Sequence, residues 1–122
     1  MMNQKLVLTV PSTNGEQKPD LLGHQRMTDL AECRFAEWFG GFTTIPGRGG
    51  WVSETCGKVV EDVALVSAFC TEEKMQAHLE NVFALAAEVA FLMGQECVAV
   101  EVNGCLHFVD AAEPAVTGRK AA

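Results

Sequence analysis

Apolar and polar residues alternate near the start of the chain and again in its middle, which is the pattern of β-strands. Residues 6–10 form the first alternating stretch, and the turn residues of 11–15 end it. Residues 59–70 form the second and longest one. Beyond Asp62 both sets of alternate positions are largely apolar, so we expect a central strand that is covered on both sides.

Two segments instead repeat their apolar residues every three or four positions, as amphipathic helices do. The first runs from about Leu21 to Phe39 and ends at Gly40-Gly41. The second begins after Thr71, a good N-cap, and ends at Gly94. The expected buried stripes are Met27, Leu30, Ala31, Phe35 and Trp38 in the first helix, and Met75, Leu79, Val82, Phe83, Ala86, Val89, Ala90 and Met93 in the second.

A glycine-rich segment follows the first helix. Residues 42–45 and 51–53 are expected as short strands, and Pro46-Gly47 is a strong turn signal between them. Near the end, strands 96–102 and 105–109 are joined by Asn103-Gly104, a typical two-residue hairpin turn.

The expected order is therefore β-α-β-β-β-α-β-β, a split βαβ arrangement of ferredoxin-like type. This predicts an α+β fold in which two helices cover one face of an antiparallel sheet. The other face would carry Leu106 and Phe108, which a solvated surface does not normally expose. We therefore expect a homodimer or a larger homo-oligomer.

The composition is that of a globular protein. At 122 residues, with 48% apolar residues, we expect one domain over residues 1–110 and a flexible tail over 111–122 that includes Arg119 and Lys120. The net charge of −7 argues against nucleic-acid binding. No apolar run is long enough for a membrane span. Five irregularly spaced cysteines and the lack of a signal-peptide pattern predict reduced thiols in a cytoplasm.

No established catalytic motif is present: there is no G-x-S-x-G, P-loop or H-E-x-x-H. Of the histidines, His24 is expected at a solvated helix start with Arg26, His78 at the edge of a buried stripe, and His107 in the core. His107 shares its strand face with Cys105, but two ligands without a third make no metal site. Neither a metal nor a cofactor is expected.

Two further groups carry side chains that can take part in catalysis. Glu61 and Asp62 are adjacent on a strand and so point to opposite faces, which prevents them from acting as a pair. Cys56 lies beside Lys58, which favours a thiolate, but no histidine is placed to act as its base.

The remaining constellation is of a binding type. Backbone N–H groups of a glycine loop can bind an anion, an arginine adds a bidentate contact, and an aromatic ring can stack on a base. This predicts a site for an anionic, nucleotide-like ligand, such as a cyclic nucleotide. The same segment also fits an ordinary structural turn. The expected ligand-binding residues are Arg48, Trp51, Phe42, Lys58, Gly49 and Gly50.

Several short motifs resemble those of small proteins from phages and mobile elements. They are Val10-Pro11-Ser12-Thr13, residues 39–43, Gly50-Trp51, Val60-Glu61-Asp62 and residues 95–98. Most such proteins have no known function, but some of this size and α+β build sequester nucleotide second messengers of bacterial immunity. The resemblance implies an anti-defence protein of the sequestering kind.

The sequence alone thus leads to a non-enzymatic, oligomeric binding protein that holds a small anionic ligand. Two alternatives stay open at this point. The first is an inhibitor that binds a host protein through its acidic surface. The second is a small enzyme of the dimeric α+β barrel type, with His107 or Glu101 in a cleft.

Overall fold

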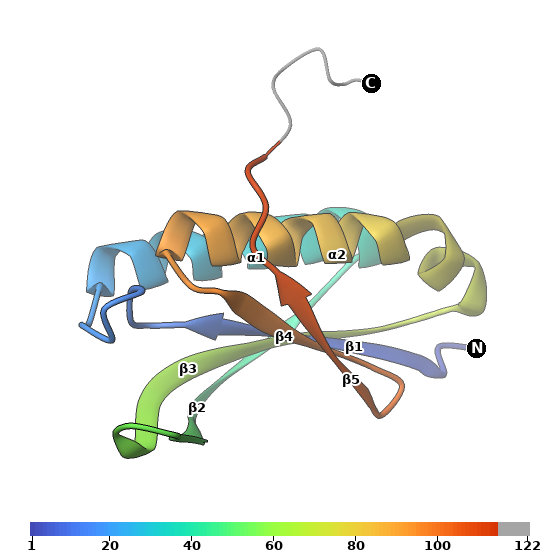
Figure 1. Cartoon of the computed structure of the whole chain (residues 1–122). Helices are drawn as coiled ribbons and strands as arrows, with labels where there is room; N and C mark the ends of the chain where they lie inside the picture. The colour runs from blue at the N-terminus through green and yellow to red at the C-terminus, as the bar shows by residue number, and fades with distance from the viewer. Residues whose placement is uncertain (115–122) are drawn as a thin grey trace.

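The computed structural model describes residues 1–114 and confirms the α+β fold class. Five strands form one antiparallel sheet in the order β2-β3-β1-β4-β5, and both helices lie against the same face of it (Figure 1). The elements are β1 (Gln4–Pro11), α1 (Leu21–Phe39), β2 (Thr43–Ser53), β3 (Gly57–Cys70), α2 (Glu72–Met93), β4 (Cys97–Val102) and β5 (Cys105–Asp110).

Local sequence signals set the ends of both helices. The Thr71 hydroxyl accepts a hydrogen bond from the Lys74 amide at 3.2 Å, which caps α2. Gly40 and Gly94 end the two helices in the left-handed conformation, with φ of 85° and 69°. Because these signals are local, the helix boundaries expected from the sequence are confirmed.

The core lies between the helices and the sheet. Leu6, Leu8 and Val10 point from β1 toward the helices and are fully buried. Alternate residues of β3 and β4 belong to the same core, and the helices contribute Phe35 from α1 and Val89 from α2. β1 and β3 each have a strand on both sides, as expected for residues 59–70, but within residues 1–114 only the face toward the helices is covered, so the expected cover on both faces is not observed (Figure 1).

One expectation about the strands is wrong. Residues 46–50 do not form a loop between two short strands, because β2 runs unbroken from Thr43 to Ser53 and pairs with β3 along its whole length. The observed order is therefore β-α-β-β-α-β-β. Pro46 is tolerated because β2 is an edge strand with a neighbour on one side only.

The sheet face away from the helices has no cover within residues 1–114 (Figure 1). We call it the open face. Its largest exposed apolar side chains are Ile45, Trp51, Phe69, Leu106 and Phe108.

The end of the described chain stays close to the fold. The amides of Ala111 and Ala112 donate to the carbonyl oxygens of Glu96 and Ala87, at 2.9 and 3.2 Å. Arg119 and Lys120 of the expected tail lie outside the described residues. Among the described helices, none is long and apolar enough to cross a membrane.

Candidate functional site

The loop between β1 and α1 is fastened to β3 by its own side chains. The Ser12 hydroxyl donates to the carbonyl oxygen of Asp62 at 2.5 Å. The Asp20 amide donates to the Ser12 carbonyl at 2.8 Å, and the Asp20 carboxylate caps α1 by accepting from the Gly23 amide. The first turn of α1 is thereby fixed against the middle of β3.

Glu61 of β3 is the most strongly held carboxylate in this region. Its Oε2 accepts hydrogen bonds from the Thr13 amide, at 3.1 Å, and from the Thr13 hydroxyl. Gln95, which follows α2, donates from Nε2 to the Thr13 carbonyl at 2.6 Å and to its hydroxyl oxygen at 3.2 Å. Within the described chain Oε1 of Glu61 receives no such bond, so it remains an acceptor for a ligand.

Two glycines let the chain segments that carry this contact approach each other. A Cβ on Gly15 would lie 2.2 Å from the Gly94 carbonyl oxygen, which is a steric clash for any side chain. The loop after β1 and the end of α2 are thus in backbone contact, which brings Gln95 within reach of Thr13.

His24 in the first turn of α1 has a defined tautomer. Its Nδ1 lies 2.8 Å from the carbonyl oxygen of Pro11. A carbonyl only accepts, so Nδ1 carries the proton and Nε2 of the neutral ring is an acceptor. The half-buried ring is one of the residues that line the adjoining cleft.

These residues surround an open cleft of about 1110 Å³ between the start of α1 and the β2–β3 hairpin. The volume is ample for a nucleoside-sized ligand. Its lining residues are Ser12, Thr13, Gln17, Pro19, Leu21, His24, Pro46, Gly47, Arg48, Val60, Glu61, Asp62 and Val63.

Arg48 and Asp62 are direct partners in the β2–β3 ladder and both line the cleft. Partners on one face of a sheet lie about 5 Å apart at their Cβ atoms. The cleft thus presents a guanidinium and a carboxylate side by side, whereas the Glu61 carboxylate projects from the opposite face of β3 and lines the cleft next to Thr13. This combination suits a ligand that carries both an ammonium and a carboxylate group.

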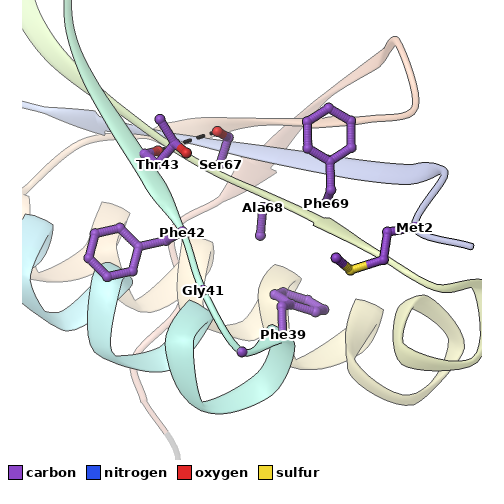
Figure 2. A pocket seen from close by; sticks show the side chains of 9 residues that line it. Met2, Phe39, Gly41, Phe42, Thr43, Ser67, Ala68 and Phe69 are labelled. Atoms are coloured by element: carbon purple, nitrogen blue, oxygen red, sulfur yellow. Dashed lines mark hydrogen bonds between the residues drawn. The ribbon is translucent and has the colours of Figure 1, made fainter.

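The structure separates the ligand-binding residues expected from the sequence. Arg48 lines the cleft, whereas Trp51, three positions further along the strand, lies on the open face. Lys58 pairs with Val52 near the hairpin end. Phe42 precedes β2 and lines a separate hollow of about 220 Å³, where Figure 2 shows it apart from Phe69 and Met2.

The glycine loop that was expected to bind an anion does not form. Gly49 and Gly50 pair with Glu61 and Val60 in the ladder, and neither has a positive φ. Consecutive N–H groups of an extended strand alternate in direction and cannot converge on an anion. Gly50 instead leaves room for the side chain of Val60, because a Cβ at position 50 would lie only 2.8 Å from Cγ1 of Val60.

Among residues 1–114, the other candidate residues lie apart from the cleft and from one another. The ring of His107 packs edge-on against Phe83, with centroids 5.4 Å apart, and that of His78 stacks on Trp38 at 5.8 Å. Burial, with smaller contributions from Asp110 and Glu96, raises the pKa of the Cys97 thiol. Within residues 1–114, no three His, Cys, Asp or Glu side chains are placed to hold a metal ion.

Comparison with known proteins relates the fold to that of an enzyme. No protein-family model and no curated protein sequence matches the chain. A phage SAM lyase in complex with S-methyl-5'-thioadenosine has a TM-score of 0.63 at 18% identity, over 88% of this chain and 89% of that one. A phage SAM lyase in the apo state has a TM-score of 0.62 at 17% identity, over 92% of each chain.

The comparison corrects the functional hypothesis drawn from the sequence. The likeness to small phage proteins of α+β build is supported at the level of the fold. The hypothesis of a non-enzymatic protein that sequesters a nucleotide signal is wrong, because the matching proteins are enzymes.

Proposed function

We propose that this chain is an enzyme that binds S-adenosylmethionine and cleaves it at the sulfonium centre, releasing S-methyl-5'-thioadenosine. The observation that carries the proposal is the likeness to a phage SAM lyase along about nine-tenths of both chains. The carboxylates of the cleft add support, since the substrate is a cation that carries both a sulfonium and an ammonium group.

The chemistry needs no second reactant. The bond between sulfur and Cγ of the methionine part breaks, and its electron pair neutralises the sulfonium. Cγ must then accept a new bond, and the substrate's own carboxylate can form it by closing a five-membered lactone. Methylthioadenosine and homoserine lactone together contain all atoms and charges of the substrate, so the enzyme only has to hold the reacting conformation.

Glu61 is the residue we assign to the substrate's ammonium group. Thr13 and Gln95 hold its Oε2, so Oε1 is already oriented when the substrate arrives. A carboxylate close to sulfur would instead stabilise the positive charge that the reaction removes, and would slow the step. Binding at the ammonium end places the negative charge where it does not oppose the reaction.

Arg48 is assigned to the substrate carboxylate, whose orientation it can fix with one hydrogen bond. A bidentate clamp would lower the reactivity of that carboxylate, so we expect Arg48 to contribute to binding more than to rate. His24 Nε2, an acceptor in the neutral ring, is assigned to a ribose hydroxyl.

The test is incubation of the purified protein with S-adenosylmethionine, with methylthioadenosine measured by liquid chromatography. We expect one methylthioadenosine for each substrate consumed. Decarboxylated S-adenosylmethionine keeps the sulfonium and the adenosine but lacks the internal nucleophile, so it should bind and remain intact. An intact substrate after prolonged incubation would reject the proposal. Cleavage of the decarboxylated analogue would show that water attacks instead.

A further inference from the structure

The loop between β1 and α1 contains a residue in an uncommon backbone conformation. Gln17 has a φ of 61°, in the left-handed region, and among residues 1–114 Asn103 is the only other non-glycine residue there. Asn103 belongs to the Asn-Gly hairpin turn, where that conformation is usual. Glutamine is not one of the residues that favour it. The conformation at Gln17 therefore needs a reason beyond local preference.

Hydrogen bonds within the loop impose this conformation. The Gln17 amide donates to the carbonyl oxygen of Asn14 at 2.9 Å, and the Asn14 amide donates to that of Lys18 at 2.8 Å. The side-chain oxygen of Asn14 accepts from the amides of Glu16 and Lys18, at 2.8 and 3.1 Å. A three-residue turn of this kind favours glycine at its left-handed position. This chain has a glutamine there instead, so the side chain is the feature to explain.

The backbone that carries Gln17 is fastened on both sides of it. Thr13 and Pro19 form an antiparallel bridge across the loop. Gly15 lies against the backbone of Gly94, at the end of α2. Gln17 is thus presented from a loop that is already ordered, so a ligand that contacts it does not have to order the backbone first.

Gln17 lines the open cleft of about 1110 Å³ together with Pro19 and Leu21. Its side chain is exposed, and no hydrogen bond within residues 1–114 engages its amide group. Leu21, the first residue of α1, exposes 75% of its surface. Pro19 and Leu21 offer an apolar surface to the face of a ring, while the Gln17 amide offers donors and an acceptor to its edge.

We infer that Gln17, with Pro19 and Leu21, forms the subsite for the adenine ring of the ligand. Adenine presents a donor, its N6 amino group, beside the acceptor N7, and a glutamine amide pairs with both at once. The residues assigned above to the ammonium, carboxylate and ribose groups leave the base without a partner. The inference rests on the proposed function, since that function makes the ligand an adenosine derivative.

Binding of S-methyl-5'-thioadenosine, measured by isothermal titration calorimetry, tests the inference without any need for cleavage. Gln17→Gly removes the side-chain amide, so the dissociation constant should rise about tenfold. Tm should stay within a few degrees of the wild-type value, because glycine suits the left-handed turn. A structural role for Gln17 would lower affinity and Tm together. Glu16→Gln is the matched control, because Glu16 belongs to the same turn but does not line the cleft.

A second measurement uses the analogue of methylthioadenosine in which hydrogen replaces the N6 amino group. The wild-type protein should bind this analogue roughly fivefold more weakly, because one hydrogen bond is lost. The Gln17→Gly variant should bind both ligands equally, since it has no amide that distinguishes them.

Three results would overturn the inference. They are equal affinity of the wild-type protein for the two ligands, an unchanged affinity in Gln17→Gly, and no binding of methylthioadenosine at millimolar concentration. The cleavage assay is separate. Discrimination between the two ligands without cleavage of S-adenosylmethionine would support the adenine subsite and reject the lyase. Cleavage with an unchanged affinity in Gln17→Gly would support the lyase and reject the subsite.

Discussion

Glu61 and Asp62 are neighbours on one strand, yet they lie in different surroundings. The Glu61 carboxylate is held by Thr13, which lies 48 positions away along the chain. Thr13 is in turn held by Gln95, which lies 82 positions from it. The Asp62 side chain is exposed, and its partner across the ladder is the exposed Arg48. Both line the same cleft.

The difference shows that two carboxylates that line one cleft can be held to very different degrees. A carboxylate whose orientation is already fixed loses little side-chain entropy when a ligand binds, whereas an exposed one has to be ordered at that moment. We therefore expect the loss of the Glu61 carboxylate to lower kcat/KM more than the loss of either member of the Arg48–Asp62 pair.

The largest expected effect comes from removing the charge at Glu61. Glu61→Gln keeps an oxygen that can accept from Thr13, so the fold should persist, but the substrate's ammonium loses its partner. We expect kcat/KM for methylthioadenosine release to fall by about 100-fold. The matched control is Asp62→Asn, which should cost only a few-fold. An equal loss in both variants would remove the distinction between the two carboxylates.

A smaller effect is expected at Arg48. Arg48→Gln removes one charge-assisted hydrogen bond to the substrate carboxylate, so KM should rise roughly 10-fold while kcat changes little. Lys58→Gln removes a positive charge from the same hairpin, outside the cleft, and should leave both constants unchanged. A fall in kcat with unchanged KM at Arg48 would place that residue in the chemical step.

The smallest effect on the reaction, with a clear effect on stability, is expected at Gly15. Gly15→Ala forces a Cβ against the Gly94 carbonyl oxygen, which should cost about 1–3 kcal/mol and lower Tm by roughly 5–10 °C. Gly41→Ala is the control, since a Cβ there meets nothing within 4 Å. The contact between Gln95 and Thr13 should weaken as well, so kcat should fall a few-fold. An unchanged Tm would show that the two backbones can separate freely.

The sequence predicts the parts of this fold that depend on near neighbours. Thr71, Gly40 and Gly94 act within a turn of the helices they limit, and Asn103-Gly104 makes its hairpin with φ of 51° and 85°. The interruption expected at Pro46-Gly47 was wrong because the register with β3, a nonlocal pairing, outweighed the local turn preference.

The candidate site depends on contacts that no spacing rule shows. The opposite orientation of Glu61 and Asp62 follows from strand geometry and is confirmed by the register. The bonds from Thr13 and from Gln95 are visible only once β1, β3 and the end of α2 are placed together. Arg48 was predicted from its residue type and lines the cleft, while Trp51 and Phe42 lie on other surfaces. Lys58 shares the sheet face of Arg48 but lies nearer the hairpin turn and does not line the cleft.

Pro46 has a consequence for the behaviour of the chain at high concentration. The outer edge of β2 is eleven residues long and is open to solvent. Such an edge can add strands from other molecules and so begin aggregation. A proline in an edge strand places its nitrogen on the solvent side, where it interrupts the row of donors that an incoming strand would need. Pro46, which suggested a turn in the sequence, thereby protects the folded protein from uncontrolled strand addition.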